Sequence, residues 1–344
     1  MIQNKKNKTL NSLQYAFIKR KDAFYQMLFT LLAVYLVWLL LRYPAEALDY
    51  ASTGLLLWFQ KMIPTLLPFM ILSGIMIRMN LTEKCVKFIH PLFHKIWGTS
   101  ANGSYVLLMG MLCGFPMGAR VIGELCQAGK LSETEGSFLL AFCNNIGPVY
   151  FISFVMSTLS LQGNYIPFAI MYGVPLVYGA FLYRIRRLSV RFRGFLSGRR
   201  PPQAAVDFRT ASGPAGAASS PSLLGAIDDS IISGLIGIAR LGGYMVFFNL
   251  LNIMMRPLNA LPERFLSLCN CLLEITSGIS RAGGGEWLMI LILLPFGGFS
   301  CISQTYSMIK ETNLSILQYF LHKCMQTALT ALIYGLFYAA SYNF

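Results

Sequence analysis

The chain has 344 residues, of which 55% are hydrophobic and only 12% are charged. A soluble domain carries roughly twice that charged fraction, so the composition excludes an ordinary soluble globular protein. The net charge of +14 does not indicate a nucleic-acid partner, because the basic residues gather in polar segments that offer no folded basic face with interleaved aromatic residues. We therefore expect the chain to lie mainly in a lipid bilayer.

Two basic segments predict how the chain is oriented. Residues 1–22 and residues 184–222 each carry many lysines or arginines and one aspartate. By the positive-inside rule, both segments should be cytoplasmic. The second segment contains a Gly/Ala/Ser/Pro-rich stretch, which predicts a basic, flexible cytoplasmic linker over residues 188–222.

Apolar runs between these two segments predict four membrane crossings. The first run has no charge from residue 24 to residue 41 and no cleavage site after it, which favours a retained helix. A short loop with Glu46 and Asp49 should separate it from the second helix. The predicted helices are 24–43, 51–77, 138–158 and 166–187, with a basic amphipathic stretch on the inner face after the second.

Residues 103–131 fit none of these crossings. They form two short arms on either side of the sequence Gly114-Phe-Pro-Met-Gly118; the first arm is apolar, and the second carries Arg120, Glu124 and Lys130. Each arm has about 12 residues, or roughly 18 Å of helix, and this is too short for roughly 30 Å of hydrocarbon. Two short arms at a Gly/Pro break predict a re-entrant hairpin, which is tolerated where the broken backbone faces a cavity.

The second half of the chain repeats this order of elements. Gly298-Phe299 corresponds to Gly114-Phe115 and again lies between two short arms. Because one unit should begin outside and the other inside, we expect an inverted repeat, as in secondary transporters. A helix bundle with chance similarity is the alternative. The predicted fold is an all-α polytopic membrane protein with two re-entrant hairpins, divided into 1–50 (N-terminus and first helix), 51–187 (first repeat), 188–222 (linker) and 223–344 (second repeat).

The turns of the two hairpins are the first candidate binding site. The helix that follows each turn exposes free N–H groups and a partial positive charge, which favour an anion. Tight helix packing is the alternative reason for the glycines. The second turn lacks the proline of the first, so the two turns can differ in function. The candidate residues are Gly114, Phe115, Pro116, Met117, Gly118, Gly298, Phe299 and Ser300.

A second candidate is the sequence Asn144-Asn145-Ile-Gly-Pro148 inside the predicted helix 138–158. Proline removes a helical hydrogen bond, so freed carbonyls and the two amide side chains can line a polar site. A simple proline kink is the alternative. The corresponding place in the second repeat holds Gln326 and Thr327.

Charged residues within apolar segments complete the candidate set. Lys61 and Arg240 each lie about ten residues into a predicted membrane helix, where charges are costly and mark functional sites. Two cations near the midplane suit a dicarboxylate, although both side chains can also snorkel to the interface. Arg120 can pair with Glu124 four residues later. Glu274 and Gln304 are further polar candidates near the second turn.

No pattern indicates catalysis or a metal centre. His90 and His94 have the spacing of a helical metal pair, but the polar face of an amphipathic helix explains them better. The eight cysteines form no CxxC pair, and the sequence has no Ser/His/Asp set, phosphate loop or zincin helix. We expect no enzyme activity, no cofactor and no metal.

Five motifs follow one another in a fixed order: Cys113-Gly-Phe-Pro-Met-Gly-Ala119, Leu131-Ser-x-x-Glu135, Phe142-Cys-Asn-Asn-Ile-Gly-Pro148, Leu273-Glu-Ile-Thr-Ser-Gly278 and Phe296-Gly-Gly-Phe-Ser300 with Gln304. In this order they resemble the YlbJ-like (stage V sporulation) integral membrane family, over about residues 50–344. The resemblance implies nucleoside-recognition or gate domains related to concentrative nucleoside transporters, with substrate bound at the hairpin turns and moved by alternating access. It also implies a role in endospore formation, a mother-cell or outer forespore membrane location and dipicolinate as substrate.

Three functions remain open at this point. The first is a transporter of a small organic anion in a bacterial cell membrane. The second is a nucleoside transporter on the same scaffold, which acidic and amide groups at the turns would favour. The third is a membrane scaffold that recruits partners through the linker without transporting anything. Homo-oligomers and other membrane proteins are further partners to test.

Overall fold

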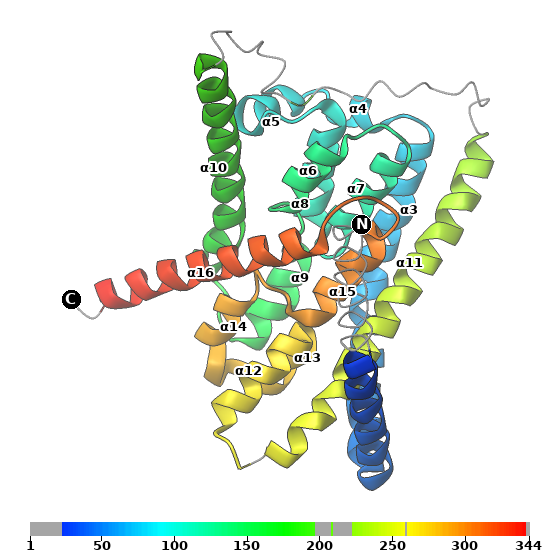
Figure 1. Ribbon diagram of the computed structural model, residues 1–344, viewed down its shortest axis with the longest axis vertical. Coiled ribbons are helices and arrows are strands. Elements are labelled where there is room, and N and C mark those ends of the chain that lie inside the picture. The colour runs from blue at the N-terminus through cyan, green and yellow to red at the C-terminus, as the bar shows by residue number, and fades with distance from the viewer. Residues whose placement is uncertain (1–22, 197–207, 209–221, 259, 342–344) are drawn as a thin grey trace, which may run out of the picture.

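The computed structural model describes residues 23–196, 208, 222–258 and 260–341, and within these residues every element is a helix (Figure 1). Five of the described helical segments are long and apolar enough to cross a membrane. The structure therefore confirms an all-α polytopic membrane protein. The five segments are Ala23–Arg42, Pro44–Arg78, Ile166–Val190, Leu223–Pro257 and Trp287–Ile309.

The second crossing begins earlier than the sequence predicts. Glu46 and Asp49 were expected in a loop, but helix α2 (Pro44–Leu57) starts one residue after Tyr43 and contains both. Proline at the first position of a helix and an acidic residue in its first turn both favour a helix start, which explains the difference. The helix continues through the π-helical turn η1 (Trp58–Met62) into α3 (Ile63–Arg78).

Helix α11 (Leu223–Leu251) packs along both α2 and α3 (Figure 1). Glycines allow this close approach, because a Cβ on Gly54 would lie 3.0 Å from the Asn249 side chain. A Cβ on Gly74 would lie 2.9 Å from the Ser230 hydroxyl. The indole N–H of Trp58 also donates to the Ile238 carbonyl at 2.8 Å. These contacts form one wall of the molecule.

The structure contains the first predicted hairpin but not the second. The first consists of α6 (Ala101–Cys113) and α7 (Met117–Gln127), which pack on each other and are joined by the first turn, at residues 114–116. Helices α14 (Trp287–Leu293) and α15 (Gly298–Ile309) are joined by the second turn, at residues 294–297, but they follow one another along one candidate span instead of folding back as a hairpin. The sequence predicts Gly298, Phe299 and Ser300 in the second turn. In the structure the turn ends at residue 297, and Gly298 starts α15.

The predicted helix 138–158 is not continuous and is not among the candidate spans of the described residues. Helix α8 (Glu133–Leu140) ends before a non-helical stretch at residues 141–147, here called the first break. Pro148 then starts the helical run α9 (Pro148–Tyr150) and η2 (Phe151–Met156). Because proline is pre-organised for the first position of a helix, it begins a new helix here instead of kinking an old one.

The predicted linker begins later than expected, because helix α10 (Ile166–Leu196) runs into residues 188–196. Most of the remaining linker, like residues 1–22, lies outside the described residues. Helix α16 (Ile316–Ser341) passes across the molecule beside α10, α14 and α15 (Figure 1). The remaining elements are α4 (Thr82–Cys85), α5 (His90–Trp97), η4 (Asn252–Leu258), α12 (Glu263–Leu273), α13 (Ile275–Ala282) and η5 (Gly283–Glu286).

Candidate functional site

Each turn packs against the backbone of an interrupted helix. Gly114 has φ of +89°, and a Cβ there would lie 2.4 Å from the Gly147 nitrogen in the first break. Gly298 has φ of +82°, and a Cβ there would lie 3.1 Å from the Cys271 carbonyl oxygen, next to the gap between α12 and α13 at Glu274. Only glycine fits such a backbone at so short a distance. We call the gap at Glu274 the second break.

The two turns also meet each other. A Cβ on Gly297 would lie 3.1 Å from Cζ of Phe115, so the phenyl ring of the first turn rests on the backbone of the second. Gly297 has φ of +75°, a left-handed conformation that glycine adopts without strain. The turns predicted from the sequence therefore come together at one place in the fold.

The carbonyl groups freed in the first break are satisfied by side chains. The amide of Gln326 donates to the Ala141 carbonyl at 2.5 Å, and the amide of Asn145 donates to the Phe142 carbonyl at 2.6 Å. The hydroxyl of Tyr172 donates to the Ile146 carbonyl at 2.9 Å. Buried backbone groups need such partners, so the break is a built feature and not a frayed helix.

Asn144 connects the first hairpin to α15 through the first break. Its Oδ1 accepts from the Ala119 N–H of α7 at 3.3 Å. Its Nδ2 donates to the Thr305 hydroxyl of α15 at 3.0 Å and to the Tyr319 hydroxyl of α16 at 3.1 Å. The side chain is fully buried and uses all three contacts. Asn144 therefore has a positioning role between the first hairpin and α15.

A fully buried lysine, which the sequence reasoning missed, lies beside the first turn. Nζ of Lys323 donates to Oδ1 of Asn145 at 2.8 Å and lies 4.9 Å from the centre of the Phe115 ring. The same Nζ lies 5.6 Å from the centre of the Tyr319 ring, which is also on α16. Within the part of the chain that the structure describes, Nζ thus contacts one amide and two aromatic faces. The sequence could have indicated Lys323, because it is a lone lysine in the apolar helix α16. The same reasoning was applied to Lys61.

Glu274 caps the helix that follows the second break. Its Oε2 accepts from the Ser277 N–H at 2.7 Å and from the amide of Asn249 at 3.5 Å. The carboxyl group is 1% exposed. It therefore fixes the start of α13, next to Gly298.

The turns and breaks line a central cavity of about 260 Å³, which opens at the surface beside the exposed side chains of Phe69, Leu112 and Val149. This volume is just below the roughly 300–1,000 Å³ of typical ligand pockets, so it suits one small ring system. Most of its wall is apolar. Its lining includes Phe115 of the first turn, Ile146 and Gly147 of the first break, Glu274 and Thr276 of the second break, and Gln304 of α15.

A second cavity, of about 550 Å³, is lined mainly by polar residues of α3, α7, α11 and α15. Arg120 and Arg240 both lie there, and Arg120 pairs with Glu124 at 2.8 Å as the sequence suggests. Lys61 is exposed and lines neither cavity. The expected midplane pair of Lys61 and Arg240 is therefore not formed, because the two side chains do not share a cavity in the described residues.

Four candidates at the turns have packing roles. Phe299 is 44% exposed and contacts Phe296 edge-on at 5.6 Å between ring centres, so it points out of the site. Met117 is fully buried in the apolar core. Ser300 accepts from the Gln304 amide at 2.9 Å. A Cβ on Gly118 would lie 3.1 Å from the Cys143 carbonyl oxygen, so this glycine lets α7 approach the first break.

Together these features define a polytopic α-helical membrane protein with a cavity lined by the first and second turns and by the two breaks. The chain is similar to "Sporulation integral membrane protein YlbJ" of Bacillus subtilis (strain 168), with 22% identity over 337 residues. The aligned part covers 88% of this chain and 80% of the relative. This similarity supports a YlbJ-like family, as the motifs predict. No family model and no solved structure matches the chain.

Proposed function

We propose that this chain transports a small organic anion of the pyridine dicarboxylate class, dipicolinate, across a membrane during spore formation. The observation that carries the proposal is the convergence of both turns and both breaks on one cavity. Non-helical backbone inside a membrane is tolerated where it lines such a cavity, and transporters place their solute at such points. Alternating access follows if the first hairpin and α15 exchange which side of the cavity they close.

Two observations support this substrate class: the name of a relative and the position of a buried lysine. The relative from Bacillus subtilis is named as a sporulation protein. Lys323 supplies a buried ammonium directly behind Phe115, which itself lines the central cavity. A rotation of the Phe115 ring would bring the ammonium into contact with a carboxylate in the cavity. Lys323 thus takes the place that the sequence reasoning gave to Lys61 and Arg240.

A nucleoside is the second candidate, and the central cavity gives it specific support. Glu274 and Gln304 line the cavity, whereas Lys323 lies behind the Phe115 ring. A carboxyl and an amide suit the hydrogen-bonding edge of a neutral base better than a dianion, because like charges repel at short distance. This candidate shares the proposed gate-like repeats and the alternating access.

A scaffold protein of spore formation is the candidate from another class. It would act through the linker and would leave the central cavity without a role. All three candidates place the N-terminus and the linker in the cytoplasm, by the distribution of basic residues. For a sporulation transporter of this kind we propose the mother-cell or outer forespore membrane.

Uptake into proteoliposomes tests these candidates. Labelled dipicolinate and labelled uridine are offered to the purified full chain, each with the other as unlabelled competitor. The anion proposal expects dipicolinate uptake that uridine does not reduce. Uridine uptake that dipicolinate leaves unchanged would move the function to the second candidate. An absence of both fluxes, in protein shown to be inserted, would overturn transport and favour the scaffold.

A further inference from the structure

The polar cavity and the central cavity lie in series along the same helices. On α11, residues from Asp229 to Arg240 line the polar cavity, and Leu241 and Met245 line the central one. On α15, Ser307 lines the polar cavity and Gln304 the central one. On α3, Arg78 lines the polar cavity and residues 64–69 include side chains that line the central one. On the first hairpin, residues of α7 between 120 and 127 line the polar cavity, and Gly114 and Phe115 of the turn line the central one.

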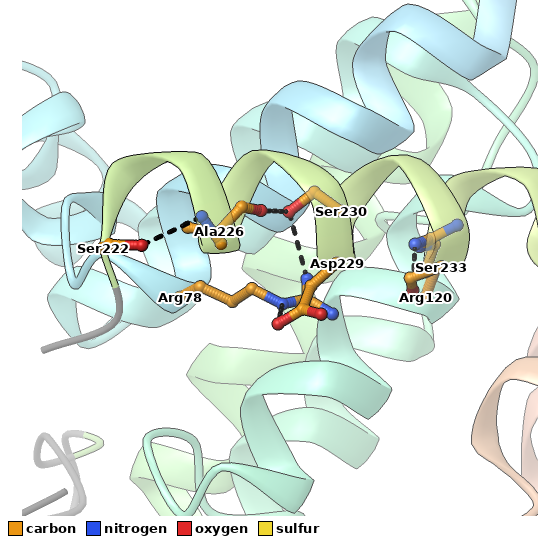
Figure 2. A network of polar contacts seen from close by, with 8 residues as sticks. Arg78, Arg120, Ser222, Ala226, Asp229, Ser230 and Ser233 are labelled. Atoms are coloured by element: carbon orange, nitrogen blue, oxygen red, sulfur yellow. Dashed lines mark hydrogen bonds and ion pairs between the residues drawn. The ribbon is translucent and has the colours of Figure 1, made fainter. Parts of the chain in front are cut away.

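The polar cavity lies at the end of the bundle where α3 ends and α11 begins. Arg78 at the end of α3 pairs with Asp229 at 4.0 Å and donates to Ser230 at 3.2 Å (Figure 2). Helix α11 follows the basic linker, which the positive-inside rule places in the cytoplasm. A solute from the cytoplasmic side would therefore meet the polar cavity first.

The side chain of Arg120 lines the polar cavity and packs against α11 and α3. A Cβ on Gly237 would lie 2.5 Å from Nη1 of Arg120 and 3.4 Å from Cε of Met70. The guanidinium is therefore seated on the bare backbone of α11. Two contacts hold it there: Nη2 donates to Ser233 at 2.9 Å (Figure 2), and Nε donates to Glu124 at 2.8 Å.

The third nitrogen of this guanidinium has no acceptor. Nη1 is buried and unpartnered among the described residues, and Arg120 is only 5% exposed. A buried donor without a partner costs free energy, and a charged donor costs more. A carboxylate can accept two parallel hydrogen bonds from a planar guanidinium. It would therefore satisfy Nη1 of Arg120 once the guanidinium moves away from Gly237. Arg240, which also lines the cavity, adds a second guanidinium.

We propose that the polar cavity is an antechamber that binds a carboxylate of the solute, and that Arg120 seated on Gly237 is the gate between it and the central cavity. This inference rests on the proposed transport function. In the closed state Arg120 blocks the passage with Nη1 unpaired. A solute carboxylate draws the guanidinium off Gly237 into the antechamber, which opens the way to the central cavity.

Native cysteines of the central cavity can report the state of this gate. Cys113 and Cys301 line that cavity and are buried, while Cys85 and Cys324 are exposed. The full chain in lipid nanodiscs is treated with a sulfonated methanethiosulfonate reagent, and labelling at each cysteine is followed by mass spectrometry of peptides. The exposed cysteines serve as internal standards for reagent activity.

Gly237→Ala is the main variant, and Gly243→Ala is its matched control. A Cβ on Gly237 would displace Arg120, whereas a Cβ on Gly243 of the same helix meets nothing within 4 Å. We expect labelling of Cys113 and Cys301 to be faster by about five-fold or more in Gly237→Ala, the effect of losing one packed contact, and unchanged in the control. Equal rates in the two variants would overturn the gate.

Arg120→Lys provides a second test if Gly237→Ala fails to fold. Lysine keeps a positive charge near Glu124 but has no forked end to cover Gly237, so labelling should again be faster. Equal labelling of Arg120→Lys and the wild type would contradict a gate at this residue. Folding of each variant is checked by its thermal unfolding.

The carboxylate part of the inference is tested by binding. Dipicolinate and its dimethyl ester are titrated into the purified full chain by calorimetry. We expect dipicolinate alone to bind, and Arg120→Lys to weaken it by about ten-fold or more, because a bidentate charged hydrogen bond is lost. Equal binding of acid and ester, or of wild type and variant, would overturn the carboxylate site.

The two proposals fail in different ways. Faster labelling in Gly237→Ala without any dipicolinate or uridine flux would support the gate and contradict the transport function. Dipicolinate flux in the wild type, with unchanged labelling in Gly237→Ala, would support transport and contradict the gate.

Discussion

The ammonium group of Lys323 lies 4.9 Å from the centre of the Phe115 ring, and the edge of that ring rests on Gly297. One aromatic side chain thus connects a buried cation of α16 to both turns. The same ring forms part of the wall of the central cavity. Movement of the turns would therefore change what the cavity presents to a solute.

The first prediction concerns this cation. Lys323→Gln removes the charge but keeps a hydrogen-bond donor for Asn145. We expect dipicolinate uptake to fall by about ten-fold or more, since a hydrogen bond to a charged group is worth about 1.5–3 kcal/mol. Uptake is measured in proteoliposomes, with Lys61→Ala as the control because Lys61 is exposed. Full uptake by Lys323→Gln would exclude the ammonium from solute binding.

The second prediction concerns the connection between the first hairpin and α15. Asn144→Ala leaves the Ala119 N–H and the hydroxyls of Thr305 and Tyr319 without their buried partner. We expect a loss of about 2–5 kcal/mol of stability, because each unsatisfied buried group costs about 1–3 kcal/mol. Thermal unfolding in detergent measures the change, and Gln60→Ala, at an exposed amide side chain, is the control. Equal melting temperatures for both variants would contradict the positioning role.

The third prediction is a pH dependence of stability from Glu135, which lies in α8 outside the candidate membrane spans. Burial raises the pKa of Glu135 to about 7, although the Ser100 N–H donates to Oε1 at 2.7 Å. The folded state therefore holds a proton that the unfolded state releases near pH 4.5. This contribution is complete below pH 4.5 and is lost as the pH rises to about 7, for a total of up to roughly 3 kcal/mol.

Unfolding measured between pH 4 and pH 8 checks this slope. Glu135→Gln should remove the fall in stability with rising pH, because glutamine does not titrate. Glu133→Gln is the control, since this residue is exposed on the same helix, and it should follow the wild-type profile. A slope that survives in Glu135→Gln would assign the pH dependence to another group.

The fourth prediction concerns the contact between the turns. Gly297→Ala adds a Cβ at φ of +75° and 3.1 Å from the Phe115 ring. We expect a loss of roughly 1–2 kcal/mol from the left-handed backbone alone, and slower uptake because Phe115 is displaced. Gly335→Ala is the control in α16, where a Cβ meets nothing within 4 Å and should stabilise by up to about 1 kcal/mol. Unfolding and uptake that match the wild type would contradict the contact.

The fifth prediction separates transport from scaffolding. Deletion of residues 198–206 from the basic linker should leave dipicolinate uptake unchanged, because the cavity is built from the helices before and after it. Spore formation in cells that carry only the shortened chain is measured in parallel. Intact uptake with failed sporulation would give the linker a recruiting role besides transport.

Most of the local architecture could be predicted from the sequence. Long uncharged runs predict spans because only helices satisfy the backbone in lipid, and short arms around Gly114 predict a hairpin because of their length. The break at Pro148 was detected, but it was placed inside one continuous helix over residues 138–158, as a polar site or a simple kink. A proline has the same local signature at a kink and at a helix start, and only the packing of Gly114 against Gly147 distinguishes the two.

The assembled site depended on the tertiary structure. The sequence by itself determined the helical class, the first hairpin, the polar break and the motifs that resemble the YlbJ-like family, because these depend on neighbours along the chain. It did not determine which buried charge lies next to the turns. Lys61 and Lys323 both follow apolar runs, and only the packing of α16 across the molecule buries Lys323 beside Phe115 and leaves Lys61 exposed. Contacts between residues distant in sequence are decided by how the helix faces pack together, and a local pattern does not record that choice.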